Sequence, residues 1–120
     1  MSTNRRSQGN QFEKLAANYL VEKGLTIIET NFYSKMGEVD IICKDNEYLC
    51  FVEVKYRKNA SAGSALEAVN FNKMRKICRA ADYYLMTHPK FANSSIRFDV
   101  IAIENGHLEY VINAFEYIQY

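Results

Sequence analysis

The stretch that decides the fold is GEVDIICKDNEYLCFVEVKYR, residues 37–57. Two apolar runs, residues 39–43 and 48–56, flank the polar residues 44–47, and this pattern predicts a β-hairpin. The second run is apolar at consecutive positions over much of its length, which is typical of a central strand covered on both faces. The fold is therefore expected to be built around this strand.

Hydrophobic periodicity and turn signals on either side of the hairpin predict the remaining elements. Upstream, we expect a flexible polar segment over residues 1–8, a helix over 9–23 that ends at Gly24, and a strand over 25–32. Downstream, we expect a longer helix that Ser64 caps and that stops before Pro89, with Glu67 completing the cap. Strands over 96–104 and 108–114 follow, joined by an Asn-Gly turn. The order αβββαββ predicts a single α/β domain over residues 9–120.

Composition excludes several classes of protein. The chain has 120 residues, 48% of them apolar, which suits one domain with its own core. Lys and Arg number 15 and Asp and Glu 14, so the net charge of +1 argues against a protein that coats nucleic acid indiscriminately. We find neither an apolar run of the ~20 residues that a membrane helix needs nor a secretory signal. Three unpaired cysteines among apolar neighbours favour a cytoplasmic protein with no membrane association.

Charged residues interrupt the two apolar runs. Glu53 and Lys55 lie two apart on the predicted central strand, so they share one face. If Asp45-Asn46 forms a two-residue turn, Asp40 pairs with Phe51 and Glu53 is its diagonal neighbour on that face. A register shifted by two residues keeps Asp40 and Glu53 together, whereas a shift of one residue separates them.

Clustered carboxylates on a covered strand predict a cation site. Asp40 and Glu53 would repel each other, Glu38 lies nearby, and Glu13 falls at the border of the apolar stripe of the first helix. A divalent cation relieves this repulsion, and oxygen ligands without His or Cys favour Mg²⁺ or Mn²⁺. With Lys55 beside it, such a site suits phosphodiester hydrolysis. The alternative interpretation is a structural salt bridge of Lys55 with Glu53 or Asp40.

Basic residues follow this cluster. Residues 55–79 contain seven Lys or Arg and one acidic residue, which is consistent with contacts to phosphates from Arg57, Lys58, Lys73 and Lys76. Lys73 is unusual because it falls within the apolar arc of the second helix, where it either contacts a bound anion or extends its amine to solvent. The alternative for the others is an ordinary solvated helix face.

The same residues resemble the PD-(D/E)xK nuclease superfamily, whose Asp-x12-Glu-x-Lys pattern is met by Asp40, Glu53 and Lys55, with Val39 in place of the proline. The chain more closely resembles the YraN-like family of bacterial endonuclease-like proteins, over roughly residues 9–103. Blocks that carry this resemblance are residues 9–13, 37–42, 51–57 and 97–100, with Asn31 and Lys73. The resemblance implies a restriction-endonuclease-like αβββαβ core, a central mixed sheet flanked by helices, here with an extra C-terminal strand.

The resemblance also implies roles for individual residues. Asp40 and Glu53 would be metal ligands, the Val54 carbonyl a third ligand, and Lys55 the catalytic lysine. Glu13 matches the first-helix glutamate of archaeal Holliday-junction resolvases, a neighbouring family, and would act beside the same triad. This kinship implies a Mg²⁺- or Mn²⁺-dependent endodeoxyribonuclease that acts on branched DNA, and it is consistent with a homodimer, since resolvases act as dimers. Two alternatives stay open: a nucleic-acid-binding or adaptor protein without activity, and an enzyme that hydrolyses RNA.

Overall fold

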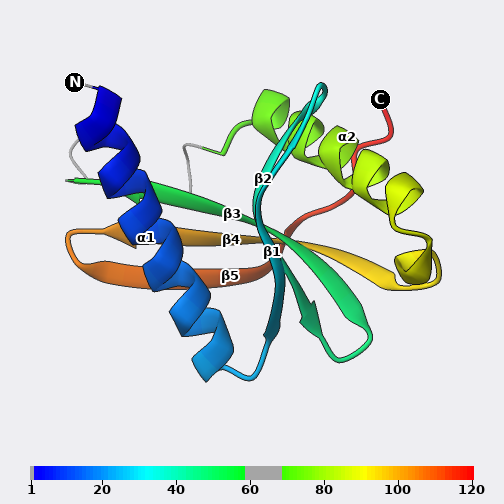
Figure 1. Cartoon of the computed structure of the whole chain (residues 1–120), viewed down its shortest axis with the longest axis horizontal. Helices are drawn as coiled ribbons and strands as arrows, with labels where there is room; N and C mark the ends of the chain where they lie inside the picture. The colour runs from blue at the N-terminus through cyan, green and yellow to red at the C-terminus, as the bar shows by residue number, and fades with distance from the viewer. Residues whose placement is uncertain (1, 59–68) are drawn as a thin grey trace.

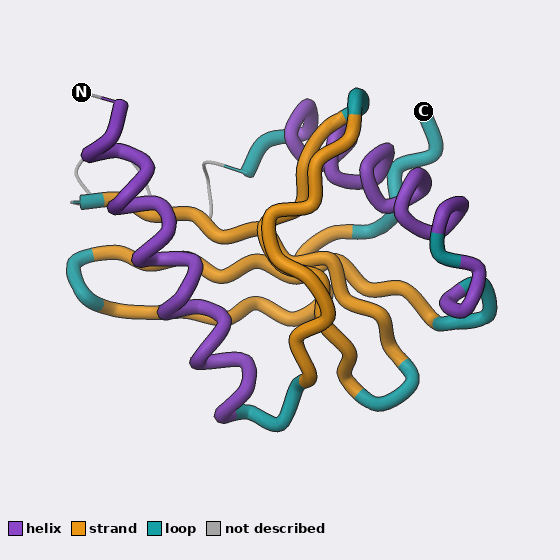
Figure 2. Tube along the Cα trace, in the orientation of Figure 1, coloured by secondary structure: helices purple, strands orange, loops and turns teal. Residues whose placement is uncertain are grey.

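The computed structural model describes residues 2–58 and 69–120, with side chains from residue 11 onward. Its elements in chain order are α1 (Ser2–Glu22), β1 (Thr26–Ser34), β2 (Gly37–Asp45), β3 (Tyr48–Arg57), α2 (Phe71–Thr87), the 3-10 turn η3 (Pro89–Phe91), β4 (Ser95–Glu104) and β5 (His107–Phe115). Figure 1 shows their arrangement, and Figure 2 traces the same path by type of element. No helix in the described part of the chain is long and apolar enough to cross a lipid bilayer.

The strands form one mixed sheet in the order β1-β2-β3-β4-β5. All neighbouring strands are antiparallel except β3 and β4, which are parallel, with α2 in the connection between them. β3 is therefore the central strand, as predicted. The αβββαβ core and the extra C-terminal strand are confirmed, because β5 adds to the outer edge of β4.

Both faces of β3 are covered, as its apolar sequence requires. Leu49 and Phe51 join the core beneath α2, whereas Cys50 and Val52 join a second core that contains Leu20 of α1. Side chains of successive strand residues point to opposite faces, so the consecutive apolar positions fill both cores. The strands accordingly lie between the two helices (Figure 2).

The turn between β2 and β3 differs from the expected one. Pairs such as Ile41 with Val52 and Asp45 with Tyr48 make the turn Asn46-Glu47, not Asp45-Asn46. Asn46 adopts a left-handed φ of 55°, which asparagine tolerates better than most residues. Asp45 is held in the ladder because its carboxylate lies 3.0 Å from the Arg97 guanidinium. The register is therefore shifted by two residues from the prediction.

Both helices begin elsewhere than expected. Helix α1 starts at Ser2, so it includes most of the segment 1–8 that we expected to be flexible. Its first turns contain no proline, and nothing in that sequence forces a later start. Helix α2 begins at Phe71, where the Asn70 side chain accepts the Lys73 backbone N–H at 2.9 Å. The predicted cap, Ser64 with Glu67, lies outside the described residues.

The C-terminal segment after β5 packs against α2. The Ile118 N–H donates to the Cys78 sulfur at 3.4 Å, and the Tyr117 hydroxyl donates to both carboxylate oxygens of Asp82 at 3.0 Å. The apolar character of this tail is therefore used within its own domain. The Asn105-Gly106 turn before β5 is confirmed, with left-handed φ values of 49° and 79°.

Candidate metal centre

The candidate site lies where β2 separates from β3. The last pair of their ladder is Ile41 with Val52, and beyond it the Val54 N–H donates to the Asp40 carboxylate at 2.7 Å. Beyond the ladder, Asp40 lies close to Glu53, whose charge and side-chain hydrogen bond both act on it. A register shift of two residues keeps the two positions on one face, so they come together although the turn differs from the expected one.

Glu53 is a buried carboxylate with one satisfied oxygen. Only 2% of the residue is exposed. Its Oε2 lies 3.2 Å from the Lys55 Nζ and 3.7 Å from the Lys73 Nζ, and both amines are partly exposed. Its Oε1 is buried and has no hydrogen-bond partner among the described residues. A buried carboxylate oxygen without a partner is costly, so this oxygen is available to a ligand.

Asp40 is held in an environment that opposes its ionisation. Burial and then the neighbouring charge of Glu53 raise the pKa of Asp40 to about 8, against the opposing effects of the Val54 N–H and the Lys73 amine. Without a cation, most of the Asp40 population would therefore carry a proton at neutral pH. A bound cation would favour the ionised form and reverse this effect.

Glu13 of α1 lies at the edge of the same cluster. Its Oε1 is buried without a hydrogen-bond partner in the described chain. Burial and the charges of Asp40 and Glu38 raise the pKa of Glu13, whereas a hydrogen bond with the Asn31 side chain lowers it. The four carboxylates that the sequence singled out are therefore close enough to influence one another.

The donor set fits a hard divalent cation. Among the described residues, no three His, Cys, Asp or Glu side chains are arranged as a group that could hold an ion. Asp40 and Glu53 are the two carboxylates that would hold one. Mg²⁺ suits such a pair because it is usually bound through one or two carboxylates and keeps several waters. The orphaned Glu53 Oε1 and the raised pKa of Asp40 are both features that a cation would relieve. Direct ligation by Glu13 and by the Val54 carbonyl stays a prediction.

The basic residues differ in how closely they approach the carboxylates. Lys73 is half-buried and reaches Glu53, so its place in the apolar arc of α2 reflects a contact with a carboxylate. Lys76 lies three residues after Lys73 on α2 and is exposed. It lines a pocket together with Glu38 and Lys73. Arg57 and Lys58 are exposed at the end of β3, beyond Lys55.

Comparison with known proteins agrees with the resemblance seen in the sequence. Residues 12–103 match the uncharacterised protein family UPF0102. The chain belongs to this family. A UPF0102 protein of Vibrio vulnificus is 48% identical over 113 residues, which cover 92% of this chain and 93% of the relative. UPF0102 proteins of Saccharophagus degradans and Lachnoclostridium phytofermentans are 46% and 39% identical, over 89% and 94% of this chain and 91% and 96% of theirs. YraN-like membership is thereby confirmed.

Asn31 and Lys73 were singled out in the sequence of this UPF0102 chain, but what each of them contacts was not predicted. Asn31, in the middle of β1, has a left-handed φ of 54° and interacts with Glu13. A lone asparagine in a strand-forming run was the available signal. The contact between Lys73 and Glu53 needs the position of α2 over the sheet and so has no local signal.

A second buried ionic cluster lies toward the other end of β3. Asp99 is fully buried and accepts hydrogen bonds from Arg97 at 2.9 Å, from the Tyr110 hydroxyl at 2.6 Å and from the Asn113 N–H at 2.9 Å. Arg97 also reaches Asp45. Because each Asp99 oxygen has donors, this cluster needs no cation. It is a structural link between β2, β4 and β5.

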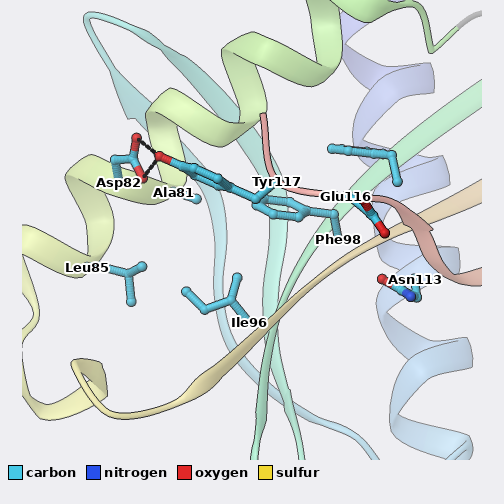
Figure 3. Close-up of a pocket in the computed structure, with 9 residues that line it drawn as sticks. Ala81, Asp82, Leu85, Ile96, Phe98, Asn113, Glu116 and Tyr117 are labelled. Carbon is cyan, nitrogen blue, oxygen red and sulfur yellow. Dashed lines mark hydrogen bonds between the residues drawn. The ribbon is translucent and has the colours of Figure 1, made fainter. Parts of the chain in front are cut away.

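A pocket of about 350 Å³ lies between α2, β4 and the C-terminal segment. Figure 3 shows its mostly apolar lining, which includes Leu85, Ile96 and Phe98. Asp82 at its rim is occupied by the Tyr117 hydroxyl and by Arg79, at 3.1 Å. Asn113 and Glu116 are the other polar residues of its wall. Since this wall lacks a pair of buried carboxylates, the Asp40–Glu53 site remains the candidate.

Proposed function

We propose that this UPF0102 protein is a Mg²⁺- or Mn²⁺-dependent endodeoxyribonuclease that hydrolyses phosphodiester bonds in branched DNA. The observation that carries the proposal is the pairing of Asp40 with the buried Glu53, with one Glu53 oxygen left without a partner. Lys55 lies 3.2 Å from the other oxygen of Glu53, which completes the set of groups that such hydrolysis uses.

A purely structural salt bridge accounts for less of what is observed. Lys55 and Lys73 both contact Glu53 Oε2, yet Glu53 Oε1 and Glu13 Oε1 keep no partner. The pKa of Asp40 is also raised to about 8 in spite of these amines. A cluster optimised for stability would satisfy its buried oxygens, as the Arg97–Asp99 cluster does in the same sheet. Carboxylate oxygens without hydrogen-bond partners support a ligand-binding site.

The residues present suggest a division of roles. Asp40 and Glu53 would hold the cation, which when bound polarises a phosphoryl oxygen and lowers the pKa of a water. The Lys55 amine would orient the attacking water and stabilise negative charge that develops on the phosphate. Glu13 would hold a further water at the edge of the site. Lys73 and Lys76 on α2, with Arg57 and Lys58 at the end of β3, would contact phosphates of the strand.

A cleavage panel tests the proposal. The wild type and the Asp40→Ala and Lys55→Ala variants are incubated with linear, flapped and four-way DNA in Mg²⁺ or Mn²⁺. We expect metal-dependent cleavage, preferentially of branched substrates, and at least a ~100-fold loss in both variants, as for removal of a group that stabilises transition-state charge. Glu47→Ala and Lys44→Ala, both exposed at the far end of the β2–β3 hairpin, are the matched controls and should cleave normally.

The same panel separates the alternatives. Binding of DNA without cleavage of any substrate would favour the nucleic-acid-binding protein, and the enzyme assignment would be abandoned. Cleavage of matched RNA substrates in place of DNA would change the substrate but keep the site. Cleavage that survives both substitutions would mean that the catalytic residues lie elsewhere.

A further inference from the structure

A groove lies between the β1–β2 hairpin and helix α2. Two adjoining pockets form it, and both are lined by Tyr33 and Ser34 of β1. The first, of about 300 Å³, also has Glu38, Lys73 and Lys76 in its wall, whereas the second, of about 560 Å³, has Lys35, Met36 and Tyr83. In Figure 1 the tip of the hairpin reaches the N-terminal half of α2, in agreement with the close approach of Gly37 to Lys76.

The outer pocket exposes large apolar side chains that packing does not require. Tyr33 is 69% exposed, Met36 55% and Tyr83 43%. The backbone around them is nevertheless held close to α2. The Tyr83 ring rests near the buried Phe32 ring, 6.2 Å between centroids, and Gly37 at the hairpin approaches the backbone carbonyl of Lys76 so closely that a methyl group would come within 2.7 Å of its oxygen. The groove is thus a preformed surface, which suits recognition.

The groove leads from the candidate metal centre. Lys73 lines the inner pocket and its Nζ lies 3.7 Å from Glu53. Lys76 comes next, and Lys35 lies beside the aromatic pocket. A carboxylate, amines and aromatic rings therefore line two pockets that share Tyr33 and Ser34. Glu38 is the acidic member of the groove, and it stands at the end nearest the carboxylate cluster.

We propose that this groove binds an unpaired nucleotide of a DNA strand, adjacent to the phosphate that is cut. Amines of Lys76 and Lys35 would contact the strand's phosphates, and the base would stack on Tyr33 between Met36 and Tyr83. Positive charge interleaved with exposed aromatic rings is the chemistry by which proteins bind single strands, because every base offers a face for stacking. The inference rests on the proposed function for its position beside the cut, and it narrows the substrate to DNA with unpaired bases.

Binding in the absence of cations tests the inference separately from cleavage. We would measure, in EDTA and at fixed low salt, the affinity of the wild type and of Tyr33→Ala for a fluorescein-labelled oligothymidylate and for the same strand with abasic sites throughout. Tyr33→Ala should weaken binding of the oligothymidylate about 5- to 150-fold, the range for loss of one stacked base. It should leave the weaker binding of the abasic strand unchanged. Tyr33→Phe, which keeps the ring, should bind like the wild type.

Tyr120→Ala is the matched control, because Tyr120 is a similarly exposed tyrosine, 79%, in the C-terminal segment. It should bind both strands normally. If Tyr33→Ala lost the same affinity for the oligothymidylate and for the abasic strand, base stacking on Tyr33 would be overturned. The inference would also be overturned if Tyr33→Ala lost no affinity, or if the wild type showed no measurable binding. A wild type that prefers oligouridylate to oligothymidylate would overturn the assignment to DNA. If Tyr33-dependent binding holds but the cleavage panel is negative, the groove stands and only the proposed activity fails.

Discussion

Asp40 shows how one residue joins the stability of the fold to the candidate site. Its carboxyl accepts the Val54 N–H, which has no strand partner on that side because the β2–β3 ladder has ended. That bond favours ionisation, yet burial and Glu53 together raise the pKa of Asp40 to about 8. The Asp40 carboxyl is thus needed as the hydrogen-bond acceptor for the Val54 N–H, although its surroundings disfavour its ionised form. Such a conflict is common where a side chain is retained for function.

The raised pKa of Asp40 predicts how stability depends on pH. Between the usual pKa of 3.8 and about 8, the unfolded chain releases a proton that the folded chain keeps. The free energy of unfolding should therefore fall as pH rises through this window and level off above it. Asp40→Asn keeps the acceptor for Val54, so it should weaken this dependence and be more stable than the wild type at pH 8 by on the order of 2 kcal/mol.

Urea denaturation at several pH values in EDTA checks this prediction. Glu47→Gln, which alters an exposed carboxylate in the β2–β3 turn, serves as a comparison for the general effect of removing a negative charge. An Asp40→Asn variant with the same pH profile as the wild type would show that Asp40 ionises normally. The pKa of Asp40 would then no longer support a cation site.

Asp99 illustrates the opposite case, in which a buried charge is fully satisfied. Asp99→Ala would remove the buried charge partner of Arg97 and leave it with the partly exposed Asp45 and the Tyr110 hydroxyl, and this should cost about 3–5 kcal/mol. Tyr110→Phe removes one hydroxyl donor, while Arg97 and the Asn113 N–H still serve Asp99, so it should cost only about 1 kcal/mol. Thermal denaturation of the two variants compares them. Similar losses would mean that the Arg97–Asp99 pair adds little beyond its hydrogen bonds.

At the scale of elements, the β1–β2 hairpin is positioned by its contact with α2. A Cβ on Gly37 would lie 2.7 Å from the Lys76 carbonyl oxygen and 3.1 Å from the Lys76 Cβ. Because the first of these is a backbone atom of a helix, Gly37→Ala must move the hairpin or α2, and it should cost about 1–3 kcal/mol. Amide hydrogen exchange should also become faster around Lys76 in α2.

Gly106→Ala provides the control for this substitution. Gly106 has a left-handed φ of 79°, and no heavy atom would lie within 4 Å of an added Cβ. Its cost should therefore come from the backbone conformation alone, about 1 kcal/mol, and exchange in α2 should stay unchanged. Normal exchange around Lys76 in Gly37→Ala would contradict a close fit between hairpin and helix.

The same elements show what a sequence can predict. Periodicity found the central strand and its neighbours because burial on a sheet or helix repeats along the chain. The register of β2 and β3 was wrong by two residues because the Arg97 partner that keeps Asp45 in the strand is distant in sequence. Asp40 and Glu53 still met, since a shift of two preserves the face. The Lys73–Glu53 contact was missed for the same reason as the register: it depends on how α2 packs over the sheet.

At the scale of the molecule, the net charge of +1 is the sum of two groups of opposite charge. Acidic side chains gather around Asp40 and Glu53, and the basic group begins beside them at Lys73 and continues to the exposed Lys76 on α2. Near-neutrality of the whole chain is consistent with local contact to a charged strand. Contacts between these amines and phosphates would release counterions, so binding of DNA should be sensitive to salt.

The close carboxylates of Asp40 and Glu53 predict that divalent cations stabilise the folded protein. A cation that binds only the native state raises the free energy of unfolding by about 2.7 kcal/mol at a hundred times its Kd. Because Asp40 must be ionised to bind, affinity should rise about tenfold per pH unit up to pH 8 and level off above it. Thermal shift with Mg²⁺ or Mn²⁺ at pH 6, 7 and 8 measures both effects. Asp40→Asn should show neither, and Glu47→Ala should match the wild type; equal stabilisation of Asp40→Asn would locate the cation elsewhere.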